Sequence, residues 1–128
     1  MKAGTNMFYS VDRVATINFS KDEFIHITTV MILMVTELPL KVIPTYTGGT
    51  IDEVLELLHF IKKQFDNQIY IDFQLSEFDL VILLRSSGAI AINGLVNKYT
   101  AISGLSQNDI NSFINKIKAV MDNYNYSL

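Results

Sequence analysis

The side chains able to do chemistry in this sequence are two histidines and two groups of carboxylates. The chain has no cysteine, and its only imidazoles, His26 and His59, are more than thirty residues apart. A metal site needs three or four ligands, usually at near-neighbour spacing, and neither histidine has such neighbours. Neither belongs to a local motif of a nucleophilic triad. We therefore expect no metal ion and no cofactor, with His26 as a hydrogen-bonded, half-buried side chain and His59 in solvent.

The carboxylates permit one catalytic alternative. Paired acids can act as general acid and base, and this chain groups its acids twice, as Asp52, Glu53 and Glu56 and as Asp72, Glu77 and Asp79. The first group falls in the opening turns of an expected helix, where the helix dipole stabilises negative charge. The second flanks a turn between expected strands, where charge keeps a sheet edge soluble. We expect a protein without catalytic activity, and a hydrolase that uses these acids is the alternative.

A phosphate site is disfavoured as well. Gly48-Gly49 precedes an expected helix, and free amides at a helix start can bind an anion. No lysine follows at the position that a phosphate loop requires, and Asp52 and Glu53 would repel the anion. We expect no nucleotide to bind here.

One surface suits the recognition of another protein. Tyr70, Asp72 and Gln74 alternate along the polar side of an expected strand, and Glu77 and Asp79 follow. A tyrosine ring adds buried contact area at low entropic cost, and the acids would attract a basic partner. We expect these five residues to bind a protein. The alternative is that they form cross-strand pairs on a sheet face in solvent.

Length and composition indicate a single domain over residues 1–128, with residues 1–6 as a flexible tail. A chain of this length buries roughly two thirds of its unfolded surface, and this one is 49% hydrophobic and 18% charged. Its net charge of −3 disfavours nucleic acid as a partner, because phosphate contacts need clustered Lys and Arg. The start has no apolar stretch of signal-peptide length, and the longest apolar segment, residues 30–35, is far short of the ~20 residues that cross a bilayer. We expect a cytoplasmic protein without a membrane segment.

Two amphipathic helices are expected, one mid-chain and one at the C-terminus. Thr50 and Glu53 form a capping box before residues 51–65, whose apolar side chains recur at helical spacing. Ser106, with Asp109 three residues later, likewise begins a helix over residues 107–123. In the first helix Leu57 and Phe60 fall outside the main apolar stripe. They indicate either a wider core contact or a surface for self-association.

The rest of the chain is expected to form strands. Residues 68–75 alternate between apolar and polar, and residues 78–84 are apolar on both faces, as in a central strand. Further strands are expected over residues 7–19, over 89–92 and from 95 or 99 to 102, with residues 40–43 as a short edge strand or extended loop.

The first third of the chain is ambiguous. Ser20 and Glu23 form a capping box that would begin a helix over residues 21–36. Many residues of that segment are β-branched, which favours strands, and strands are our preferred interpretation. The expected fold class is therefore α+β, an antiparallel β-sheet packed with two amphipathic helices.

The order of these elements resembles that of a known family. Expected strands come first, followed by TGGTIDEVLELLHFIKKQF, by IYIDFQL and FDLVILLRSSGAIAINGL, and by SQNDINSFINKIKAVMDNY. This arrangement resembles small bacterial immunity proteins, the inhibitors of polymorphic and contact-dependent growth inhibition toxins, over residues 40–124. The resemblance lies in element order without a diagnostic motif, so it assigns no functional residue.

The resemblance implies a cytoplasmic protein that binds one cognate toxin domain and blocks its activity without chemistry of its own. Many such toxins are basic nucleases, and an acidic inhibitor suits them electrostatically. The alternative function is a small self-associating regulatory or scaffolding subunit, a homodimer that pairs through Leu57 and Phe60.

Overall fold

A computed structural model of the chain describes residues 14–66 and 72–126. Within them, two short strands and six α-helices follow one another, with one 3₁₀ turn between the first two helices. In chain order they are β1 Val14–Ile17, α1 Lys21–Glu37, η1 Leu40–Val42, α2 Ile43–Thr47, α3 Ile51–Asp66, β2 Phe73–Ser76, α4 Glu77–Ile92, α5 Val96–Ser103 and α6 Gln107–Asn123.

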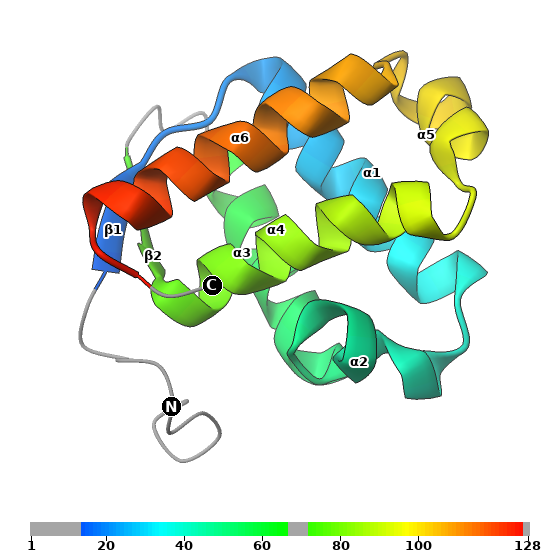
Figure 1. Cartoon of the computed structure of the whole chain (residues 1–128), viewed down its shortest axis with the longest axis horizontal. Coiled ribbons are helices and arrows are strands. Elements are labelled where there is room, and N and C mark those ends of the chain that lie inside the picture. Colours follow the sequence, from blue (N-terminus) through cyan, green and yellow to red (C-terminus); the bar gives the residue numbers. More distant parts are fainter. Residues whose placement is uncertain (1–13, 67–71, 127–128) are drawn as a thin grey trace.

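Helix α4 lies at the centre of the molecule. It contacts α1, α2, α5, α6 and β2, and Figure 1 shows it between α6 and α2. Leu80, Ile82 and Ile90 are fully buried on it, whereas Arg85 and Ile92 reach solvent. A helix covered on most sides must be apolar nearly all round, which explains why the segment lacks an amphipathic stripe.

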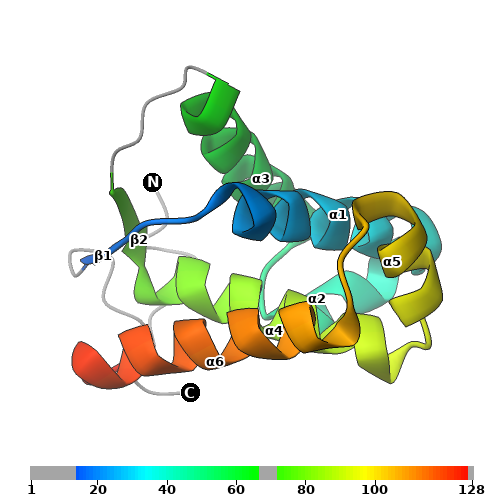
Figure 2. The ribbon, with the colours of Figure 1, turned by 90° about the horizontal axis from the view of Figure 1, so that it is seen from above.

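The other long helices lie on either side of α4 and α1. Helix α6 packs along α4, and α3 packs against α1. Figure 2 shows α3 and α6 on opposite sides of the molecule, with α1 and α4 between them. The α3 side chains buried in this core are Val54, Leu57 and Ile61, each at most 3% exposed.

The two strands form a small antiparallel ladder at one end of the helices. Val14 pairs with Ser76 and Ile17 with Phe73. The inward side chains of both strands are buried, and Phe19, just after β1, packs on Phe73 and on Phe113 of α6. The ladder therefore joins the start of the described chain to the start of α4 and to α6.

The expected fold class is wrong. The structure is mostly helical, at 76%, and its described residues form a two-stranded sheet with six α-helices instead of a sheet packed with two helices. Four expected strand segments are helical, with residues 78–84 and 89–92 in α4, the segment ending at 102 in α5, and residues 40–43 in η1 and the start of α2.

The preferred strand interpretation of residues 21–36 is wrong, and the helix left open as its alternative is present. Residues 21–36 form α1, and the Ser20 and Glu23 capping box is present, with both reciprocal hydrogen bonds. The strands expected over residues 7–19 and 68–75 are present in part, as β1 and β2. Residues 7–13 and 68–71 lie outside the described residues.

The two amphipathic helices are confirmed. Residues 51–65 lie in α3 and residues 107–123 form α6, each beginning with its predicted capping box. Among the described helices, none is by itself long and apolar enough to cross a membrane, and α4 with α5 meets that test only as a pair bent by 113°.

Candidate functional site

The N-terminal turns of α1 and α6 meet and enclose a pocket of about 400 Å³. Ser20 caps α1 and Ser106 caps α6, and each cap is closed by an acid three residues on, Glu23 or Asp109. Both helix starts therefore bring carboxylates to the same place. The volume lies within the range of pockets that bind small ligands or single side chains.

The pocket has a polar rim and an aromatic floor. Asp22, Asp109 and Ser112 are exposed at its mouth, and Phe113 and His26 are buried beneath. The ring centroids of His26 and Phe113 are 4.3 Å apart. A ligand in this pocket would meet acids outside and ring faces inside.

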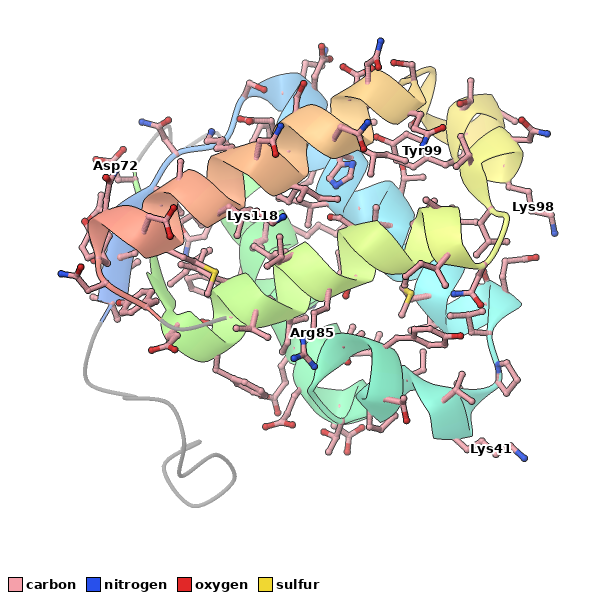
Figure 3. The ribbon with its side chains drawn as sticks, in the orientation of Figure 1. Lys41, Asp72, Arg85, Lys98, Tyr99 and Lys118 are labelled. Atoms are coloured by element: carbon pink, nitrogen blue, oxygen red, sulfur yellow. The ribbon has the colours of Figure 1, made fainter. Side chains whose placement is uncertain are left out.

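His26 is held from two sides by hydroxyl groups of other helices. Its Nδ1 lies 2.7 Å from the Tyr99 hydroxyl on α5, and its Nε2 lies 2.9 Å from the Ser87 hydroxyl on α4. Because the Ser87 hydroxyl donates its proton to the Leu83 carbonyl, we assign Nε2–H as the donor to Ser87 and Nδ1 as the acceptor from Tyr99. Figure 3 shows Tyr99 pointing inward from α5.

Burial keeps this network neutral. It lowers the pKa of His26 to about 4, against the opposing effect of the nearby Glu23 and Asp109 carboxylates. It also raises the pKa of Tyr99 to about 12, and the Asp109 charge adds to that shift. The predicted hydrogen bonding of His26 is confirmed, but the side chain is 1% exposed and thus fully buried, not half-buried.

The Ser87–His26 pair is not arranged for nucleophilic catalysis. The Ser87 side chain is 1% exposed, and its hydroxyl accepts a hydrogen bond from His26 while donating one to the Leu83 carbonyl. A base must accept the nucleophile's proton, and an acid would be needed at Nδ1 where Tyr99 lies. The network therefore fixes helices to one another and shapes the pocket floor.

Charge at the rim is partly neutralised. Lys116 of α6 forms an ion pair with Glu23, 2.7 Å between Nζ and Oε1. Burial opposes ionisation of Glu23, but hydrogen bonds from Lys116 and the Ser20 N–H lower its pKa below its usual value. Asp22 makes no side-chain hydrogen bond or ion pair with the described residues. Asp22 and Asp109 thus supply the net negative charge of the mouth.

The residues predicted to bind a partner lie elsewhere, and the structure describes four of the five. Asp72 and Gln74 are exposed, and they accept from Asn18 and donate to Thr16 respectively. These are contacts to the β1 side of the ladder, the arrangement weighed as the alternative. Tyr70 lies outside the described residues.

Burial removes much of the remaining predicted surface. The Glu77 residue is 6% exposed in the first turn of α4, and Asp79 closes the capping box of that helix. Figure 3 places Asp72 at the opposite end of the molecule from Tyr99. Asp72 nevertheless bonds to Asn18, two residues before Ser20 of the pocket rim, so the predicted group lies near the pocket but contributes no lining residue to it.

The first carboxylate group and His59 belong to α3. Glu53 accepts from the Thr50 N–H in the capping box, while Asp52, Glu56 and His59 are exposed. In the described part of the chain, no three residues of the histidine and carboxylate types gather as a metal site would require.

Sequence reasoning did not find the pocket. Ser20, Glu23, Ser106 and Asp109 were recognised as capping residues, but the strand interpretation of residues 21–36 kept the two helix starts apart. A comparison of the chain with protein-family models, curated proteins and solved structures finds no match. The assignment of function therefore depends on the geometry alone.

Proposed function

We propose that this protein is a toxin-neutralising immunity protein that binds a basic toxin domain, and that a Lys or Arg side chain of the toxin enters the pocket between α1 and α6. The single observation that carries this proposal is the acidic mouth of that pocket above an aromatic floor. The protein would act in the cytoplasm without chemistry of its own, because a nuclease toxin must be blocked where its substrate lies.

The pocket suits a long basic side chain in both of its parts. The carboxylates of Asp22 and Asp109 match a guanidinium or ammonium group, and the Phe113 ring and Leu105 match its aliphatic stem. The basic group of the toxin would be paired with a carboxylate when it is buried, and this pairing offsets part of the free energy needed to remove the charge from water. The acids at the mouth would also accelerate encounter with a basic partner.

The pocket is preorganised by the helices that form it. Glu23 and Asp109 are fixed by their capping boxes, and His26 is fixed by Tyr99 and Ser87. A rim that does not reorganise loses little conformational entropy on binding, which favours tight inhibition.

The proposal is tested first by an affinity capture from the native host, with the purified protein as bait and mass spectrometry to identify retained proteins. A single stoichiometric toxin fragment is expected. Co-expression of the two proteins should then protect cells from the toxin. Capture of the bait alone, or a captured toxin whose activity is unchanged, would contradict the immunity function.

The site is tested with two matched charge reversals on the identified complex. Asp22→Lys at the pocket mouth should reduce the association rate roughly tenfold at low salt and flatten its salt dependence. Asp122→Lys makes the same charge change at the other end of α6, where Asp122 is exposed, and should have little effect. Equal effects of the two substitutions would place the toxin elsewhere on the protein.

A further inference from the structure

The outer face of α3 is a second surface with features of an interface. Within the described residues, α3 packs mainly against α1 and α2, and Figure 2 shows it projecting at the side opposite α6. Leu55 and Phe60, each 42% exposed, lie on this face, and the edge of the Phe60 ring also meets Phe73 of β2, with ring centroids 6.2 Å apart. A partner that covers both side chains would remove their exposed apolar surface from water.

Charge along this face is arranged in two halves. Asp52 and Glu56 lie toward the start of α3, and His59 and Lys63 lie toward its end, all on the same side of the helix at helical spacing. The order also suits the dipole of a single helix, so it does not by itself indicate a partner.

The spacing of these residues makes the face complementary to itself. Three pairs of positions on this face share one midpoint, between Leu57 and Leu58. The pairs are 52 with 63, 55 with 60, and 56 with 59. If two copies of α3 lie antiparallel about a twofold axis through that midpoint, Asp52 of each copy faces Lys63 of the other, and Glu56 faces His59. The flanking Leu55 side chains then meet on one side of the seam and the Phe60 side chains on the other.

We propose that the outer face of α3 binds a second copy of this chain, forming an antiparallel, twofold-symmetric helix pair with reciprocal contacts between Asp52 and Lys63. This surface differs from the expected one, because Leu57 is 3% exposed and belongs to the core. The inference does not depend on the proposed function, since the toxin pocket lies between α1 and α6.

The size of the helix predicts a weak dimer. Sixteen residues at 1.5 Å each give a contact about 24 Å long, which buries less area than a permanent dimer requires. The pairing should therefore appear between micromolar and millimolar protein concentration, and dilution should reverse it.

The test uses two charge-reversal variants. Each should repel a second copy of itself, and the two should attract one another. In a dimer of the Lys63→Asp variant, position 63 of each copy would place an acid opposite Asp52 of the other. In a dimer of the Asp52→Lys variant, position 52 of each copy would place a lysine opposite Lys63 of the other. Sedimentation equilibrium of the full chain should show a wild-type monomer–dimer equilibrium and at least tenfold weaker pairing for each variant alone. An equimolar mixture of the two variants restores both opposite-charge contacts, so it should form a heterodimer at about wild-type strength.

Folding and charge effects are separated by controls. Circular dichroism and thermal melting must show that both variants keep the wild-type helix content. Asp122→Lys, with the same charge change on α6, should dimerise as the wild type does. A wild-type protein that stays monomeric at millimolar concentration, or a mixture that remains monomeric while the wild type dimerises, would overturn the proposal.

Discussion

The most consequential single residue in the described chain is His26, because it lies where four helices meet. The side chain belongs to α1, hydrogen-bonds to Ser87 of α4 and Tyr99 of α5, and its ring lies tilted against Phe113 of α6. Both ring nitrogens are satisfied in the neutral form. Protonation would require the Tyr99 hydroxyl to turn from donor to acceptor and would place a charge in a buried site, which the fold disfavours.

This network predicts a loss of stability in mild acid. The unfolded chain takes up a proton on His26 near pH 6.5, whereas the folded protein excludes it until about pH 4. Ionisation of His26 should therefore leave the free energy of unfolding unchanged above about pH 7 and lower it between pH 6.5 and pH 4 by about 3 kcal/mol in total. Urea denaturation at a series of pH values measures this slope.

Two substitutions separate this effect from other titrations. His26→Gln should remove the slope between pH 6.5 and 5, at the cost of a lower stability at pH 7. His59→Gln makes the same change at an exposed histidine and should keep the slope. A slope that survives His26→Gln would exclude His26 as its source. Below pH 4.5 Glu23 contributes as well, since its lowered pKa gives stability that is lost as the acid is protonated.

At the scale of the element, the capping box is the sequence signal that marks the start of every long helix in the described chain. A Ser or Thr followed three residues later by Asp or Glu begins α1, α3, α4 and α6, and the reciprocal hydrogen bonds are present in each. The α3 and α6 helices were predictable because each combines a box with an amphipathic stripe. The Ser76 and Asp79 box before α4 was present in the sequence and would have indicated that helix.

Four helices were missed, α1, α2, α4 and α5, and the two long ones among them, α1 and α4, have sequences that also suit strands. Helix α4 is apolar on nearly all sides because other elements cover it, and a short apolar run of this kind does not distinguish a buried helix from a central strand. Helix α1 contains many β-branched residues, but tertiary packing outweighs a propensity of a few tenths of a kcal/mol per residue. The pocket and the His26 network depend on both helices, so neither was predictable without them.

Two glycines at contrasting positions test this description of the elements. Gly88 lies inside α4, where an added Cβ would meet nothing within 4 Å, so Gly88→Ala should stabilise the protein by about 0.5–1 kcal/mol. Gly48 ends α2 at φ +81°, so Gly48→Ala should destabilise it by about 1–2 kcal/mol. Urea denaturation of both variants measures the difference. If residues 86–88 formed a turn between two strands, Gly88→Ala would not stabilise the protein.

At the scale of the whole molecule, the described helices share one core. The buried side chains form a single cluster that reaches from β1 through α1, α3 and α4 to α6. Helix α3 is the outermost member, yet Val54 and Ile61 are fully buried against the rest. A domain with one core and no independent unit unfolds in a single cooperative step.

This predicts that α3 melts together with α4 and not before it. Far-ultraviolet circular dichroism, which follows all helices, and tyrosine fluorescence, which follows the surroundings of residues such as Tyr99, should give coincident urea transitions at low micromolar protein.

Leu80→Ala on α4 should cost about 2–5 kcal/mol and shift both transitions equally, since Leu80 is fully buried. Leu55→Ala, at a half-exposed position on the outer face of α3, should cost under about 1 kcal/mol.

A separate early transition in the circular dichroism signal would mean that α3 is held less firmly than its buried side chains indicate. In that case the outer face of α3 would need its partner copy to be stable, and raising the protein concentration would move that early transition to higher urea.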